Sequence, residues 1–149
     1  MRPPSEVLQV GREILDPVFD PHGFRFEPGE FGTGSGGPFA SGSYVRAGRR
    51  LEVHVRHSLG LVTYHVGALA LPHEDLMRAL VPPGERAAYP GFSNDPLDGF
   101  RHLRADLDRF GQPFLAGVEE ELRAVAARAV QLRRARPRGF RAISKPPAG

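Results

Sequence analysis

The segment from Arg49 to Leu71 reads RRLEVHVRHSLGLVTYHVGALAL, and it decides the fold that we expect for this chain. Apolar and polar residues alternate on both sides of Leu59-Gly60, which is the pattern of two β-strands joined in a hairpin. With the turn centred on Leu59-Gly60, the register pairs Val53 with Val66, Val55 with Tyr64, His54 with His65 and Arg56 with Thr63.

The same alternation gives the predicted hairpin two different faces. The apolar face holds Leu51, Val53, Val55, Val62, Tyr64, Val66 and Ala68, which we expect in the core. The polar face holds Glu52, His54, Arg56, Thr63, His65 and Gly67. A sheet packed on one side leaves such a polar face solvated, covered by a partner, or used as a site.

The segments around the hairpin predict helices on both sides of it. Apolar residues at helical spacing predict a helix from about Glu6 to Phe19, capped by Ser5. Later helices are predicted near Leu76–Leu80, from Asp95-Pro96-Leu97-Asp98 to Phe110, and from about Pro113 to Arg136.

Short strands are predicted at Phe24–Phe26 and Phe39–Val45, separated by a glycine-rich loop over residues 28–38. With the hairpin they make an antiparallel sheet of about four strands. The expected fold class is therefore α+β, a two-layer sandwich with an N-terminal helix, this sheet and C-terminal helices. We expect one domain over residues 1–136 and a basic, disordered tail over residues 137–149.

Composition excludes several classes of function. The 149 residues contain no cysteine, which excludes disulfides, thiolate metal sites and cysteine nucleophiles. No apolar run approaches the roughly 20 residues that span a bilayer, and MRPPSEVLQV lacks the apolar region of a signal peptide, so we expect a cytoplasmic location.

The net charge of +3 is unevenly divided along the chain. Residues 131–149 carry six basic residues and no acid, so the remainder is slightly acidic. The basic pI therefore describes the tail and weakens the case for a nucleic-acid-binding domain.

The candidate ligand-binding residues are those of the polar face: Glu52, His54, Arg56, Thr63 and His65. Directly opposed residues have Cβ atoms roughly 4.5–5.5 Å apart, close enough for two imidazoles to share a metal, a proton or an anion. Arg56 offers a planar fork of donors to a phosphate or carboxylate, and Glu52 can orient a histidine. The alternative is that these are ordinary solvent-facing residues.

Other motifs give no catalytic constellation. The chain has no HExxH motif and no GxSxG motif, and GTGSGG at 32–37 lacks the lysine of a phosphate-binding loop. We therefore predict no catalytic residue, metal or cofactor. The loop Tyr89-Pro90-Gly91-Phe92 either closes over a ligand or, as we favour, packs its aromatic rings onto the core.

In this order, ILDPVFDPHGFRF, SYVRAGRRLEVHVRHS and LVTYHVGAL resemble small uncharacterised bacterial proteins in which a helix ends at Gly-Phe and an antiparallel sheet and helices follow. The resemblance covers about the first half of the chain and rests on Gly23-Phe24, the strand Tyr44–Arg46 and the paired strands. Some such families look like toxin-immunity or other conflict-associated proteins. The resemblance implies an immunity-like role and transfers no catalytic residue.

These observations lead to three hypotheses. The first is a non-enzymatic cytoplasmic binding protein whose polar sheet face holds a protein partner or an anionic ligand. The second is a small hydrolase or lyase with His54 and His65 as acid and base and Arg56 holding an anionic substrate. The third is nucleic-acid binding through the basic tail. The oligomeric state stays open, because an exposed sheet edge can pair with a second copy.

Overall fold

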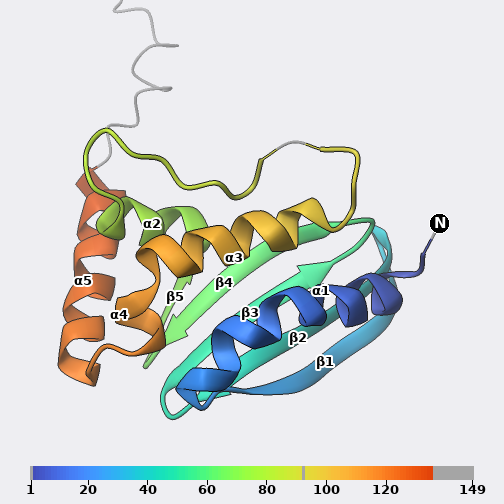
Figure 1. The fold of residues 1–149 in the computed structure, drawn as a ribbon, viewed down its shortest axis with the longest axis horizontal. Helices are drawn as coiled ribbons and strands as arrows, with labels where there is room; N and C mark the ends of the chain where they lie inside the picture. The colour runs from blue at the N-terminus through green and yellow to red at the C-terminus, as the bar shows by residue number, and fades with distance from the viewer. Residues whose placement is uncertain (1, 92, 136–149) are drawn as a thin grey trace, which may run out of the picture.

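The computed structural model describes residues 2–91 and 93–135 of the chain. The chain begins with helix α1 (Pro4–Phe19) and a short 3-10 turn (Asp20–His22). Five strands follow: β1 (Arg25–Gly34), β2 (Gly37–Arg46), β3 (Arg49–Val55), β4 (Leu59–Val66) and β5 (Leu69–Pro72). Helices α2 (His73–Leu80), α3 (Asp98–Phe110), α4 (Gln112–Leu115) and α5 (Glu119–Ala135) complete the described chain (Figure 1).

The five strands form one antiparallel sheet in sequence order, β1-β2-β3-β4-β5. This confirms the predicted α+β class with an N-terminal helix and C-terminal helices, although the sheet has five strands where about four were expected. The additional strand is β5, which pairs with the second half of β4 from Thr63↔Pro72 to Val66↔Leu69. Ala68, expected in the core, instead lies exposed in the β4–β5 turn.

The glycine-rich segment at residues 28–38 is not the predicted loop. It forms the far ends of β1 and β2, which pair as far as Gly34↔Gly37. Backbone pairing needs no particular side chain, so the composition alone did not reveal it. Close approach explains one of the glycines, because a Cβ on Gly29 would lie 2.5 Å from the Ser41 hydroxyl.

The predicted register of the central hairpin was wrong by four residues, while the predicted faces were right. Val53 pairs with Val62 and Glu52 with Thr63, because the chain turns at 56–58 rather than at Leu59-Gly60. An irregularity between His54 and Val55 pairs Val55 with Leu59. Because side chains alternate with period two, an even shift moves partners along the strand and leaves each side chain on its face.

The hydrophobic core lies between the helices and one face of the sheet, where α1 and α3 lie side by side (Figure 1). The sheet contributes fully buried side chains such as Tyr44, Leu51 and Tyr64. The helices contribute Leu15, Phe19, Phe100, Leu103 and Leu107. The two helices meet closely at Gly11, where a Cβ would lie 2.4 Å from the Phe100 ring.

The predicted last helix is divided into α4 and α5. Carbonyl oxygens where α4 ends are bound by arginines of the β2–β3 turn: Arg49 donates to the Phe114 oxygen at 2.7 Å and to Gly117, and Arg46 donates to the Leu115 oxygen at 3.2 Å. These bonds satisfy acceptors that a helix end leaves free. The break therefore depends on residues more than sixty positions away, which the periodicity of the segment cannot show.

Among the described residues, no helix is long and apolar enough to cross a membrane.

Candidate functional site

The sheet face that points away from the helices carries the predicted site residues, and we call it the open face. The strand pairings set its side chains in rows that cross the strands. The first row, here the basic row, is Arg25–Val45–Arg50–His65–Ala70; the second, the acidic row, is Glu27–Ser43–Glu52–Thr63–Pro72; the third is Ser41–His54–Leu61. The open face therefore carries a row of positive charge next to a row of negative charge, and both rows run across the strands.

The basic and acidic rows are joined by ion pairs. Glu27 lies 2.9 Å from Arg25 and 3.3 Å from Arg50, and the His65 Nε2 donates to Glu52 at 3.0 Å. All of these side chains keep a third or more of their surface exposed. Exposed pairs contribute only about 0.2–1 kcal/mol each. The pairs therefore orient these side chains but hold them together only weakly.

The third row ends in an aromatic and apolar area. His54 stacks on Phe39 with ring centroids 5.3 Å apart and planes 9° from parallel. The Arg56 guanidinium lies over the Phe39 ring, 5.8 Å from the ring centroid, and donates a hydrogen bond to the Gly37 carbonyl oxygen at 3.0 Å. Beside them Leu61 is 66% exposed. This end of the open face offers apolar surface, whereas the other end offers charge.

The structure keeps the predicted site residues on one face but separates the two histidines. His54 lies opposite Leu61, and His65 lies opposite Arg50. Leu61 and His65 are four positions apart along β4, roughly 13 Å at about 3.3 Å per residue. The predicted His54–His65 pair is therefore wrong, and its cause is the shifted turn. Glu52, Thr63 and His65 do lie together, within the acidic and basic rows.

A second polar group, which the sequence reasoning missed, lies buried between the sheet and the helices. The Tyr64 hydroxyl lies 2.7 Å from His73 Nδ1, and His73 Nε2 lies 2.8 Å from Asp106 Oδ2. Asp106 also accepts the backbone N–H groups of Ala88 at 2.6 Å and Tyr89 at 3.0 Å. Asp106 follows Leu103 by three residues on the apolar stripe of α3, and a charged residue there is the signal that could have revealed the group.

The electrostatics of this network keep Asp106 charged. Burial alone would raise the pKa of Asp106, but hydrogen bonds from His73, Ala88 and Tyr89 outweigh it and hold the pKa below its usual value. Asp106 is thus a carboxylate that accepts from His73 Nε2, and the Tyr64 hydroxyl shares a hydrogen bond with Nδ1. Burial also raises the pKa of Tyr64 well above its ordinary range. All three side chains are at most 3% exposed, so the network ties the loop and α3 to the sheet.

The loop before α3 packs against this network. The Tyr89 ring meets the His73 ring edge-on at 5.4 Å, and its hydroxyl donates to the Gly60 oxygen at 2.5 Å. For Tyr89 this arrangement agrees with the interpretation that the loop packs its aromatic residues onto the core; Phe92 lies outside the described residues. A hollow of about 250 Å³ remains between β4 and the loop, with Thr63, Glu74 and Pro90 among its lining residues.

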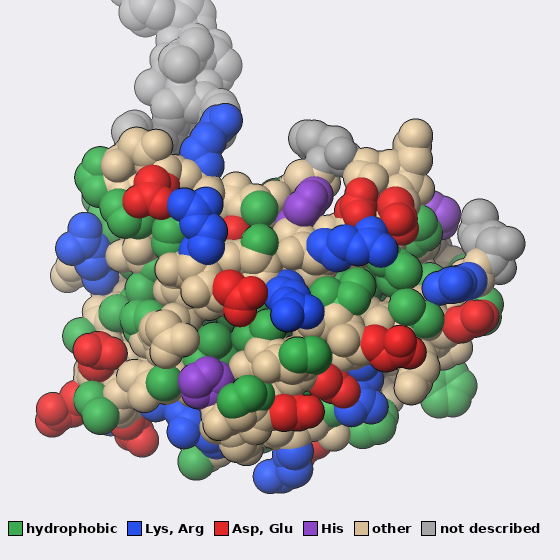
Figure 2. All heavy atoms as spheres, in the orientation of Figure 1, with side chains coloured by type: hydrophobic (Ala, Val, Ile, Leu, Met, Phe, Trp, Pro, Cys, Tyr) green, Lys and Arg blue, Asp and Glu red, His purple; other side chains and the backbone are tan. Residues whose placement is uncertain are grey.

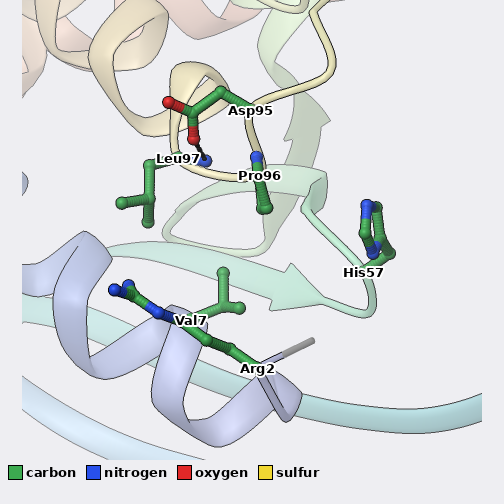
Figure 3. Close-up of a pocket in the computed structure, with 6 residues that line it drawn as sticks. All are labelled: Arg2, Val7, His57, Asp95, Pro96 and Leu97. Carbon is green, nitrogen blue, oxygen red and sulfur yellow. Dashed lines mark hydrogen bonds between the residues drawn. The ribbon is translucent and has the colours of Figure 1, made fainter.

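A larger hollow of about 440 Å³ lies between the starts of α1 and α3 and the β3–β4 turn (Figure 3). In Figure 3, Val7, Pro96 and Leu97 lie between Arg2 on one side and His57 on the other. Its acid, Asp95, accepts the Leu97 N–H and an Arg101 N–H, so its charge is already satisfied. No predicted site residue lies in this hollow.

Charge on the helix side of the molecule has a different arrangement. Figure 2 shows acidic and basic side chains interspersed over the side that α1 and α3 occupy. Many of them pair within one helix turn, as do Arg12 and Asp16 at 3.3 Å and Arg123 and Glu119 at 2.7 Å. Rows of one sign running across several elements are a feature of the open face.

In the described ranges, no group of three or more histidine, aspartate or glutamate side chains is placed to hold a metal ion. Comparison with family models, with curated proteins and with solved structures gave no match. The basic tail predicted for residues 137–149 lies outside the described residues.

Proposed function

We propose that this protein is a non-enzymatic binding protein that holds a protein partner on its open face. The observation that carries the proposal is the succession of a basic row, an acidic row and an apolar end on a sheet face that the described helices leave uncovered. Complementary charge gives an interface its specificity and its register. Small-molecule sites, in contrast, are concave.

The energetics of the face favour recognition by a partner surface. Its ion pairs are exposed and weak, so charges can be exchanged with a partner at little cost. Leu61 and the ring of Phe39 supply apolar area next to them, as the centre of an interface requires. A partner of matching chemistry carries an acidic row opposite the basic row, a basic row opposite the acidic row, and an apolar group over Leu61.

An immunity-like role is the specific version of this proposal, and it rests on the resemblance given above. In that version the partner is a toxin with the complementary charge rows, and binding blocks its activity. A cytoplasmic location fits such a role.

The hydrolase or lyase hypothesis has lost the acid–base pair on which it depended, because the register places His54 and His65 far apart. His65 retains a carboxylate neighbour, Glu52, but both are exposed and neither lines an enclosed cavity with a nucleophile. We therefore offer no second function.

The proposal is tested by affinity capture from an extract of the source organism, quantified by mass spectrometry. The baits are the wild-type protein, His54→Ala/Arg56→Ala, Glu52→Lys and the control Glu120→Lys, which changes an exposed residue of α5. We expect the same captured protein with the wild type and the control, and at least tenfold less with the two open-face variants. Equal capture by all four folded baits would remove the proposal.

A further inference from the structure

The end of the sheet that carries the β2–β3 and β4–β5 turns gathers positive charge. Arg46 pairs across the strands with Arg49 on the helix-facing side of the sheet, and Arg50 pairs with His65 on the open face. Like charges placed directly opposite each other destabilise a sheet. The Arg46–Arg49 pair therefore breaks a local rule, and such breaks are expected at functional sites.

Of Arg46 and Arg49 only Arg49 is buried, and Glu119, the acid that acts on its charge, forms its ion pair with Arg123. Arg49 is 8% exposed, and among the described residues no carboxylate lies within ion-pair distance of Arg46 or Arg49. Their donors bind main-chain carbonyls, and the Nε of Arg46 is buried without a hydrogen-bond partner. Burial, followed by the charge of Arg46, lowers the pKa of Arg49. The two side chains thus contribute fixed positive charge beside the turn.

A hollow lies at this point on the surface. It has a volume of about 240 Å³ and is lined by Val45, Gly48, Arg49, Arg50, His65 and Gly67. A smaller hollow of about 100 Å³ adjoins it through Gly48, Arg49 and Gly67. Both glycines have a positive φ, and a Cβ on either would meet open space, so the turns leave the hollow accessible.

From this juxtaposition we propose that the hollow is a binding site for a small phosphate-bearing anion, with Arg50 and His65 as donors and the turn beside Arg49 as its wall. The volume is below the roughly 300–1,000 Å³ of sites for drug-sized ligands, so the occupant is inorganic phosphate or a small phosphate monoester. A guanidinium binds a phosphate through two parallel N–H groups.

The acids near the site do not prevent this binding. Arg50 pairs with Glu27 and His65 with Glu52, but both pairs are exposed. Exposed ion pairs are weak because water screens them. A phosphate dianion replaces these two weak pairs with charge-assisted hydrogen bonds from Arg50 and His65. The site goes beyond the proposed function, since it takes a small anion at the sheet end, although its donors Arg50 and His65 also belong to the basic row.

The experiment is an amide NMR titration of the full-length protein with inorganic phosphate at constant ionic strength and pH 7. We expect saturable shifts of the Gly48 and Gly67 amides, about tenfold weaker binding for Arg50→Gln and for His65→Gln, and binding within twofold of wild type for the control Arg104→Gln, which changes an exposed residue of α3. Titrations with phosphoglycolate and with acetate separate a monoester site from a general anion site.

Three outcomes would overturn the inference: no saturable shift at these glycines, the same shifts with chloride or acetate, or unchanged binding by Arg50→Gln. The titration is independent of the partner assay. His54→Ala/Arg56→Ala is expected to bind phosphate normally, so failure of the phosphate site and failure of the binding-protein proposal are distinguished.

Discussion

Replacing Asp106 by alanine removes the acceptor of three N–H groups, that of the buried His73 ring and those of the part-buried Ala88 and Tyr89 main chain. A buried donor left without a partner costs about 1–3 kcal/mol, so three such donors kept dry would cost about 3–9 kcal/mol. The hollow of about 250 Å³ that His73 and Tyr89 line admits water to part of the group. We therefore expect a loss of about 3–5 kcal/mol, a large fraction of the 5–15 kcal/mol typical of a domain.

Urea unfolding followed by circular dichroism measures this loss. The matched control is Asp108→Ala on the same helix, where the carboxylate is exposed and lies 3.7 Å from Arg104. The control is expected to change the free energy of unfolding by less than about 0.5 kcal/mol. A loss below about 1 kcal/mol for Asp106→Ala, or equal losses for both variants, would refute the role assigned to the network.

The same carboxylate predicts a pH dependence. Its pKa is lower in the folded protein than the value of about 3.9 for an unfolded aspartate. Its stabilising contribution is therefore fully present above that value and is lost as the pH falls through the folded pKa. The stability difference between the wild type and Asp106→Asn should thus be larger at pH 6 than at pH 2.5. A difference independent of pH would contradict the charged state of Asp106.

Two further predictions concern packing and register. Gly11→Ala gains about 1 kcal/mol of helix propensity, but the added Cβ would lie 2.4 Å from the Phe100 ring. We therefore expect urea unfolding to show a net destabilisation of about 1–3 kcal/mol. A stabilised variant would show that α1 and α3 are less closely packed. Cysteines at His54 and Leu61 should form a disulfide under mild oxidation, whereas cysteines at His54 and His65 should remain free thiols by mass spectrometry. The opposite result would restore the register expected from the sequence.

Side-chain faces of the hairpin could be predicted from the sequence, but its register could not. Alternation fixes which residues share a face, and Val53 and Tyr64 remain on the core face for any even shift. The register depends on where the chain turns, and two turns compatible with the same alternation differ by four residues. The shift changed the neighbours of His54 and His65, and with them the chemistry that the face can support.

The parts that the sequence did not reveal depend on contacts between distant segments. Asp106 and His73 are thirty-three residues apart, and only the fold makes them partners. The break between α4 and α5 depends on Arg49, which binds carbonyls at the end of α4. Both contacts had a signal in the local sequence, because Asp106 and Arg49 are charged residues at positions that the periodicity places in the core.

Site-specific photocrosslinking shows whether the open face is the surface that binds a partner. A benzophenone amino acid is placed at Thr63 on the open face or at Glu120 on α5, and each protein is irradiated in an extract of the source organism. We expect one crosslinked partner from Thr63 and none of that partner from Glu120. A partner crosslinked from Glu120 alone would contradict this expectation.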